Sequence, residues 1–331
     1  MYFPSDEERR YVQRRLLPDA RQQGVVEDLR GWRWDRAPLQ PVYAAPLGIY
    51  EIAGKYCPTG RDVYLRRVAR VSAAPNQGMV EGRLLHQLVA ELVIEAKRRI
   101  YQHGAACLEA LEALHVSPVD GEPVPPGVSD PEGLRAKLAA VRAYEARRVV
   151  ERVQDVLARQ PQAGADAIVA LALPVHVEVK LNGGLLGLSA RLSTDGYLYA
   201  ESMVADLKFG PREEFHRLTT AGYALVLESI YEVPIDVGCI VYVGFRNGRV
   251  TIERDFHVIG DELRHWFLEE REEKMRLVAE EVDPGLPNEC PRTCPYLRTC
   301  HPAERGAATP AGDRGFANLP VDGVAQAVGV G

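Results

Sequence analysis

The feature that most constrains the fold is a change in hydrophobic periodicity near residue 160. Before this point apolar residues recur at helical spacing, as in 77–103, where leucines and an isoleucine share one face. After it, the segments 167–181, 185–200 and 202–209 are rich in Val, Leu, Ile and Tyr and are separated by short breaks that contain glycine. This pattern is typical of β-strands. The chain must therefore form a sheet that follows a largely helical first half.

The rest of the second half predicts how that sheet is completed. A helix is expected at 212–232, after the three strands. A hairpin follows, because Asn247-Gly248 between two apolar runs is the residue pair that a type I′ turn favours. An acidic helix begins at Asp261. This order predicts an α/β (α+β) fold in which helices flank a mixed sheet.

Capping signals locate the helices of the first half. Ser5 followed by Glu8 forms a capping box, which opens a helix that runs to about residue 22. Asp130-Pro131 caps a second long helix that runs to about residue 160. Two short helical runs flank Cys57, and the Pro- and Gly-rich segment 115–129 is expected to be a loop.

These patterns divide the chain into four parts. Residues 1–160 form a helical N-terminal part that contains Cys57 and His86, and 161–283 form the sheet-containing core. Residues 284–302 form a cysteine-containing segment. The tail, 303–331, lacks periodicity, and we expect it to be disordered.

Composition limits the classes of protein to which the chain can belong. Its 331 residues are 46% hydrophobic and 26% charged, which is ordinary for a soluble globular protein. No stretch approaches the roughly 18 apolar residues of a membrane span, so we expect no membrane contact and a cytoplasmic location. The net charge is −6, but nine acidic residues against four basic ones give 261–283 alone a charge of −5. Arginine clusters elsewhere could neutralise phosphates locally, or they could be solvated helix faces.

The sequence Asp206-Leu-Lys208 closes the apolar strand predicted at 202–209. Alternate side chains of a strand point to the same face, so Asp206 and Lys208 should lie together. Carboxylates hold hard divalent cations, and a lysine beside them can orient an attacking water. Asp195, eleven residues earlier on a neighbouring strand, could supply a second carboxylate. The sequence therefore predicts a hydrolytic metal site.

Two alternatives to this site remain open. Glu178-Val-Lys180 has the same acid-x-Lys pattern on a predicted strand, with Asp166 twelve residues before it. That pattern runs into Asn-Gly-Gly, however, whereas Asp206-Leu-Lys208 leads into a helix that carries Tyr223. The other alternative is that Asp206 and Lys208 form a surface ion pair at a strand end.

The ordered motifs resemble those of RecB-type nucleases of the PD-(D/E)xK fold. They are Gly82-Arg-Leu-Leu-His86 on a helix, Asp195, Asp206-Leu-Lys208-Phe-Gly, and Tyr223 on the next helix. The resemblance implies that His86 and the two aspartates hold Mn²⁺ or Mg²⁺. It also implies that Lys208 is catalytic together with the aspartates, and that Tyr223 belongs to a Gln-x-x-x-Tyr element that contacts substrate. Thr219 stands where that Gln is usual.

Three cysteines lie close together near the end of the predicted fold, in Cys290-Pro-Arg-Thr-Cys294-Pro-Tyr-Leu-Arg-Thr-Cys300. Cys57, which is also followed by proline, is the plausible fourth thiol from the far end of the chain. Proline after a ligand removes a backbone donor and stiffens the loop, as in many iron-sulfur ligand runs. Thiolates also bind zinc, and His301 could complete a three-cysteine, one-histidine zinc site without Cys57. Ligand chemistry alone leaves both metals open.

One cysteine before the nuclease motifs and three after them resemble the arrangement of CRISPR-associated RecB-type exonucleases of the archaeal type I-A branch, over residues 1 to about 302. The resemblance implies an iron-sulfur cluster, [4Fe-4S] rather than [2Fe-2S], on Cys57, Cys290, Cys294 and Cys300. It further implies a metal-dependent DNA exonuclease that processes spacer precursors before integration. Its expected partners are DNA, single-stranded or with single-stranded ends, and the CRISPR integrase proteins.

Two other functions fit the same residues. One is a catalytically weak iron-sulfur protein that holds DNA ends or an integrase partner. The other is a RecB-type DNA repair nuclease outside CRISPR. Metal-dependent cleavage separates the first from an exonuclease, and genomic neighbours separate the second.

Overall fold

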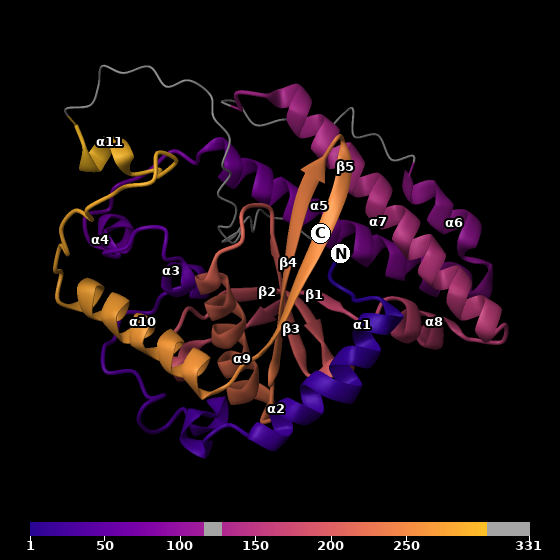
Figure 1. Cartoon of the computed structure of the whole chain (residues 1–331), viewed down its shortest axis with the longest axis horizontal. Helices are drawn as coiled ribbons and strands as arrows, with labels where there is room; N and C mark the ends of the chain where they lie inside the picture. Colours follow the sequence, from indigo (N-terminus) through magenta and orange to yellow (C-terminus); the bar gives the residue numbers. More distant parts are fainter. Residues whose placement is uncertain (116–127, 303–331) are drawn as a thin grey trace, which may run out of the picture.

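The computed structural model describes residues 1–115 and 128–302. The tail expected at 303–331 and most of the loop expected at 115–129 lie outside the described residues. In the described part, a five-stranded sheet lies between two groups of helices (Figure 1). No described helix is long and apolar enough to cross a membrane. The predicted mixed sheet flanked by helices, with a helical N-terminal part, is confirmed.

The strands lie in the order β1-β2-β3-β4-β5. Their bounds are His176–Leu181, Leu192–Leu198, Met203–Lys208, Val237–Arg246 and Arg249–Val258. Neighbouring strands are antiparallel, except that β3 and β4 are parallel and are joined through helix α9 (Arg217–Tyr231). At the β4–β5 turn, Asn247 and Gly248 have φ of 52° and 72°, so the predicted type I′ geometry is confirmed.

The helices of the first half begin where the capping signals predict. Their bounds are α1 Asp6–Tyr11, α2 Leu17–Gln23, α3 Ile49–Ala53, α4 Arg61–Arg67, α5 Gln77–His103, α6 Leu108–Glu112, α7 Pro131–Arg159 and α8 Ala165–Ala172. The capping box at Ser5 and Glu8 is present, and Asp130 Oδ1 accepts a hydrogen bond from the Gly133 amide at 2.9 Å. The second half adds α10 (Asp261–Ala279) and the short α11 (Leu297–Cys300).

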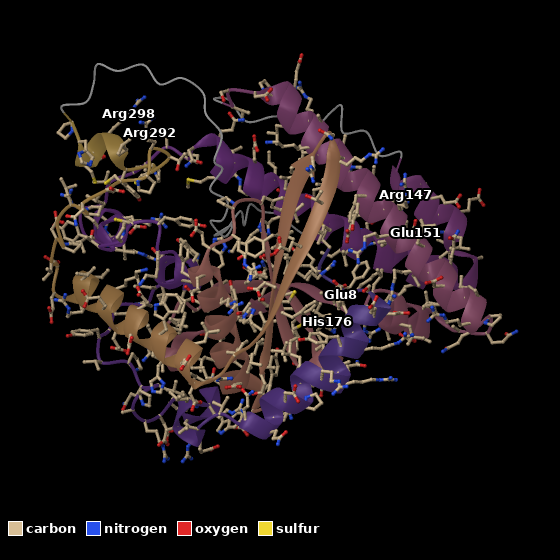
Figure 2. The ribbon with its side chains drawn as sticks, viewed as in Figure 1. Glu8, Arg147, Glu151, His176, Arg292 and Arg298 are labelled. Atoms are coloured by element: carbon tan, nitrogen blue, oxygen red, sulfur yellow. The ribbon has the colours of Figure 1, made fainter. Side chains whose placement is uncertain are left out.

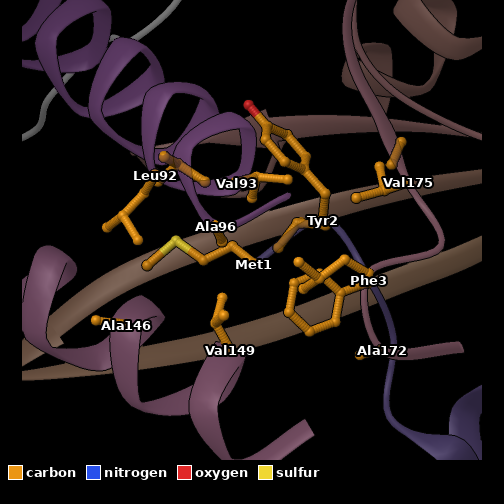
Figure 3. Packing of buried hydrophobic residues seen from close by; sticks show 14 of the residues in the cluster. Met1, Tyr2, Phe3, Leu92, Val93, Ala96, Ala146, Val149, Ala172 and Val175 are labelled. Atoms are coloured by element: carbon orange, nitrogen blue, oxygen red, sulfur yellow. The ribbon is translucent and has the colours of Figure 1, made fainter. Parts of the chain in front are cut away.

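Two hydrophobic cores cover the two faces of the sheet. The first joins α5, α7 and α8 to the sheet, and Figure 3 shows Tyr2 and Phe3 packed between α5 and α7 within it. The second joins α3, α9 and α10 to the opposite face. Met203, Ala205 and Leu207 of β3 belong to the first core, and Val204 belongs to the second. Asp206 and Lys208 therefore face the side covered by α3 and α9.

The strand predicted at 167–181 is wrong over its first half. Residues 165–172 form helix α8, and the strand begins only at His176. Alanine, the best helix former, alternates with apolar residues here and mimics a strand pattern, while Ile168 and Ala172 are buried one helical turn apart. The strand predicted at 185–200 is likewise shorter, because Gly187, with φ of 68°, ends a 3₁₀ turn that precedes it.

Candidate functional site

A cleft opens where α4, α5 and α9 approach β2 and β3. It encloses about 1030 Å³ of empty space, including its open mouth. Its lining includes all five residues predicted for the nuclease site: His86, Asp195, Asp206, Lys208 and Tyr223. The structure therefore brings together side chains from two strands and two helices. In the sequence, only the order of the motifs linked these residues.

Asp206 and Lys208 face the cleft from the end of β3. Lys208 Nζ lies 2.7 Å from Asp206 Oδ2, and each residue is only 5% exposed. Apart from this ion pair, the buried Oδ2 has no hydrogen-bond partner among the described residues. The predicted shared face is confirmed, and burial excludes the alternative of a surface ion pair.

His86 reaches the same site from α5. Its Nδ1 lies 3.2 Å from Asp195 Oδ2, and its ring meets the edge of Phe209 with centroids 5.4 Å apart. Asp195 Oδ2 also accepts a hydrogen bond of 2.9 Å from the Leu207 amide on the neighbouring strand. These contacts fix the second-strand aspartate between the helical histidine and the strand that carries Asp206.

The two aspartates have opposite pKa shifts. Burial raises the pKa of Asp206 to about 6, although Lys208 opposes the rise, and Asp195 adds to it. Burial would also raise the pKa of Asp195, but the charge and hydrogen bond of His86 outweigh it and lower that pKa. The charge and hydrogen bond of Asp195 in turn raise the pKa of His86, although burial of the imidazole opposes the rise. Each aspartate is thus held beside a nitrogen-bearing partner, Asp195 beside His86 and Asp206 beside Lys208.

Tyr223 faces the cleft from α9, but its hydroxyl is bonded to the protein. It donates to the carbonyl oxygen of Ser193, two residues before Asp195. Ser193 Oγ in turn donates to Glu178 Oε2 at 2.8 Å. In this structure Tyr223 helps to hold strand β2, and Thr219, one turn earlier on α9, also lines the cleft.

The alternative acid-x-Lys pattern contributes only part of its residues to the cleft. Glu178 lines it, whereas the side chain of Lys180 is 74% exposed and lies 3.2 Å from Glu178. Asp166 lies in the first turn of α8, where it interacts with Tyr101. The structure thus does not assemble Asp166, Glu178 and Lys180 into a site of their own.

Several cleft residues were not found from the sequence. His216 is 4% exposed and is bound by the hydroxyls of Tyr56 at 2.9 Å and Tyr242 at 3.1 Å. Burial and the charge of Lys208 lower its pKa to about 3, so it is neutral. Arg83 also lines the cleft. It could have been predicted from the sequence, because it lies one helical turn before His86 on α5.

The structure brings Cys57 to the C-terminal cysteine segment. A second cavity is lined by Cys57 and Cys294, together with Tyr56, Asp62 and Arg66, which also line the main cleft. Burial raises the pKa of Cys294 to about 11, and the nearby Cys57 and Cys300 contribute to the rise.

Cys290 does not line this cavity, and its Sγ is 3.4 Å from His301 Nε2. All four cysteines are half-buried. Figure 2 shows Arg292 and Arg298 of this segment far from Arg147 and Glu151 of α7.

Polar contacts attach this segment to the helices around the cleft. Asn76 caps α5, accepting from the Met79 amide at 2.9 Å, and donates to the Thr293 carbonyl at 2.7 Å. Arg66 on α4 donates to the hydroxyl of Tyr296 at 3.3 Å. The segment between Cys290 and Cys300 therefore contacts the end of α4 and the start of α5, two of the helices that line the cleft.

The side chains of His86, Asp195 and Asp206 offer the types of atom that bind a divalent cation, but in this structure those atoms already contact other side chains. Two carboxylates and an imidazole suit Mn²⁺ or Mg²⁺, but Oδ2 of Asp206 is held by the ammonium group of Lys208 at 2.7 Å. Within residues 1–115 and 128–302, however, no three His, Cys, Asp or Glu side chains are grouped so that they could hold a metal ion. Cation binding would have to replace the contact between His86 and Asp195.

Comparison with known proteins identifies relatives over most of the chain. A family described as CRISPR-associated exonuclease Csa1 matches residues 1–303. A protein of that name from Thermoproteus tenax is 36% identical over 277 residues, covering 83% of this chain and 91% of the relative. Another from Saccharolobus solfataricus is 30% identical over 284 residues, covering 84% and 93%. No solved structure matches.

Proposed function

The chain belongs to the family of CRISPR-associated exonucleases Csa1, and from this premise we propose that it is a metal-dependent DNA exonuclease with an iron-sulfur cluster. Its substrate is DNA that is single-stranded or has single-stranded ends. Its role is the trimming of spacer precursors in CRISPR adaptation, beside the integrase proteins that insert them. The core at 161–283 is assigned to the PD-(D/E)xK fold.

One observation carries the nuclease assignment. His86, Asp195, Asp206 and Lys208 come from three separate elements, and all four line one cleft. A buried ion pair with no catalytic task is costly to maintain, because desolvation of the two charges offsets much of their attraction. A pair that faces a cleft beside a second carboxylate and an imidazole is what hydrolysis of a phosphodiester requires.

The residues have separate tasks in this proposal. His86, Asp195 and Asp206 would hold Mn²⁺ or Mg²⁺, which when bound supplies Lewis acidity toward the phosphate and an activated water. Lys208 keeps a fixed positive charge at the strand end, where it offsets the negative charge that develops on the scissile phosphate. Tyr223 keeps Ser193 and hence the strand of Asp195 in register.

The cysteines support the second part of the proposal. Cys57 shares a cavity with Cys294, although 237 positions separate them in the chain. Half-buried thiols drawn from both ends of the sequence suit a cluster that ties these ends together, as structural metals do. Cys290 and Cys300 complete the ligand set, and [4Fe-4S] is preferred to [2Fe-2S].

The test is a cleavage assay on single-stranded and duplex DNA with Mn²⁺, Mg²⁺ or a chelator. Cleavage should require a divalent cation and should be faster with Mn²⁺, because Mg²⁺ accepts the imidazole of His86 less readily. The Asp195→Ala variant should lose metal binding and activity together. Equal cleavage in the chelator would contradict the proposed function, and DNA binding without cleavage would favour a scaffold that holds DNA ends.

A further inference from the structure

The cleft proposed to bind DNA carries more acidic than basic side chains. Its carboxylates are Glu51, Asp62, Glu178, Asp195 and Asp206, and its lysines and arginines are Arg66, Arg83 and Lys208. A DNA strand adds a negative charge at every phosphate, so cations that are not already paired must hold it in place. The contacts that each cationic side chain makes within the protein therefore decide which of them can bind a phosphate.

Two of the three are engaged within the protein. Lys208 lies 2.7 Å from Asp206 and is buried. Arg66 donates to the Tyr296 hydroxyl, lies 3.7 Å from Glu51 and packs over the ring of Tyr50. Neither the ammonium group of Lys208 nor the guanidinium group of Arg66 can move toward a ligand without losing these contacts.

Arg83 differs from both. It is exposed at the cleft, and among residues 1–115 and 128–302 it has no carboxylate or other hydrogen-bond partner. Arg83 lies three residues before His86 on α5, so the two side chains are neighbours on one helix face. Both side chains line the cleft in which His86 approaches Asp195.

We infer that Arg83 is a positioning residue that binds a backbone phosphate of the DNA strand, next to the phosphate that is cleaved. The planar fork of an arginine can donate two hydrogen bonds to one phosphate, which fixes orientation as well as position. This inference rests on the proposed function, because it takes DNA as the ligand of the cleft. It assigns to α5 the task of orienting the strand as well as supplying His86.

The test compares Arg83→Ala with Arg98→Ala. Arg98 lies on the same helix, its side chain is 62% exposed and paired with Glu95, and it does not line the cleft. Arg83→Ala should raise KM for a single-stranded oligonucleotide about tenfold or more, with little change in kcat. In Ca²⁺ instead of Mn²⁺, the salt dependence of binding should fall by about 0.7 in log–log slope, as for one lost phosphate contact. Arg98→Ala should change neither, and Arg83→Lys should restore the slope but only part of the affinity.

The outcomes separate this inference from the proposed function. If Arg83→Ala and Arg98→Ala bind DNA alike while the wild type cleaves normally, the role of Arg83 is refuted and the nuclease stands. If the wild type binds DNA with the Arg83-dependent slope but does not cleave, the nuclease is refuted and the phosphate site stands. Loss of kcat with unchanged KM in Arg83→Ala would also overturn a positioning role.

Discussion

Replacing Lys208 with alanine tests the chemistry of the cleft most selectively. The ammonium group lies 2.7 Å from Asp206 on a side chain that is 7% exposed, and it has no metal-ligand role while protonated. The variant should therefore keep metal and DNA binding but lose the charge that stabilises the transition state. Preorganised groups of this kind are worth about 10²–10³ in rate, or roughly 3–4 kcal/mol.

The loss of stability should be much smaller than the loss of rate. The pKa of Asp206 is raised to about 6, so at pH 7 its protonation in the wild type costs only on the order of 1 kcal/mol. In a variant without Lys208, Asp206 can become protonated, because a neutral carboxyl group needs no cation beside it. The electrostatic loss in the free energy of unfolding therefore cannot much exceed the cost of protonating Asp206. Most of the rate loss cannot come from unfolding.

The assays are single-turnover cleavage with saturating Mn²⁺, Mn²⁺ binding by titration calorimetry, and urea denaturation. Lys180→Ala is the matched control, because Lys180 pairs with Glu178, which lines the cleft, while the side chain of Lys180 itself is 74% exposed and does not line it. Such pairs contribute about 0–1 kcal/mol, so this variant should be nearly normal in every assay. If Lys180→Ala instead lost the rate while Lys208→Ala kept it, the assignment of the site would be wrong.

Three further predictions concern the cluster, the core and pH. Anaerobically purified protein should be brown and contain iron and sulfide, and Cys57→Ser should bleach it as strongly as Cys294→Ser; colourless protein with stoichiometric zinc would contradict this. Glu228→Gln should reduce the free energy of unfolding by about 3–5 kcal/mol in urea titrations, because the buried Arg264 loses its carboxylate partner and Arg30 keeps only Asp236. An unchanged midpoint would refute that role. The pKa of His216 is lowered to about 3, so stability should fall as pH drops from about 6.5 toward 3, by up to about 1.4 kcal/mol per pH unit. His216→Gln should flatten that slope, and an identical pH profile would exclude His216 as its source.

The placement of Asp206 beside Lys208 and of His86 on a helix could be predicted from the sequence because each depends on a local pattern, whereas their grouping as nuclease motifs was implied by the resemblance to RecB-type nucleases. Alternation along β3 is sufficient to put Asp206 beside Lys208, and helical spacing places His86 on α5. The signals at Ser5 and Asp130 are equally local, since a cap needs only its own first turn. These predictions agree with the structure for that reason.

Other parts of the architecture depend on partners far apart in the sequence. Glu228 accepts hydrogen bonds from Arg30 and Arg264, and no spacing rule joins these positions. Glu178 and Lys180 form an alternative pair in the sequence because they share a face of one strand, whereas in the structure only Glu178 lines the cleft. Helix α8 was missed because alanine-rich apolar runs fit both periodicities until packing selects one.

We propose that Asp206 lies at the centre of a metal-dependent nuclease site. Its role is tested by parallel cleavage of single-stranded DNA in Mn²⁺ by wild type and Asp206→Ala, with folding of both checked by urea denaturation. We predict that the wild type degrades the DNA and that the folded variant does not, even at high Mn²⁺. Equal degradation by the two proteins would refute this role of Asp206.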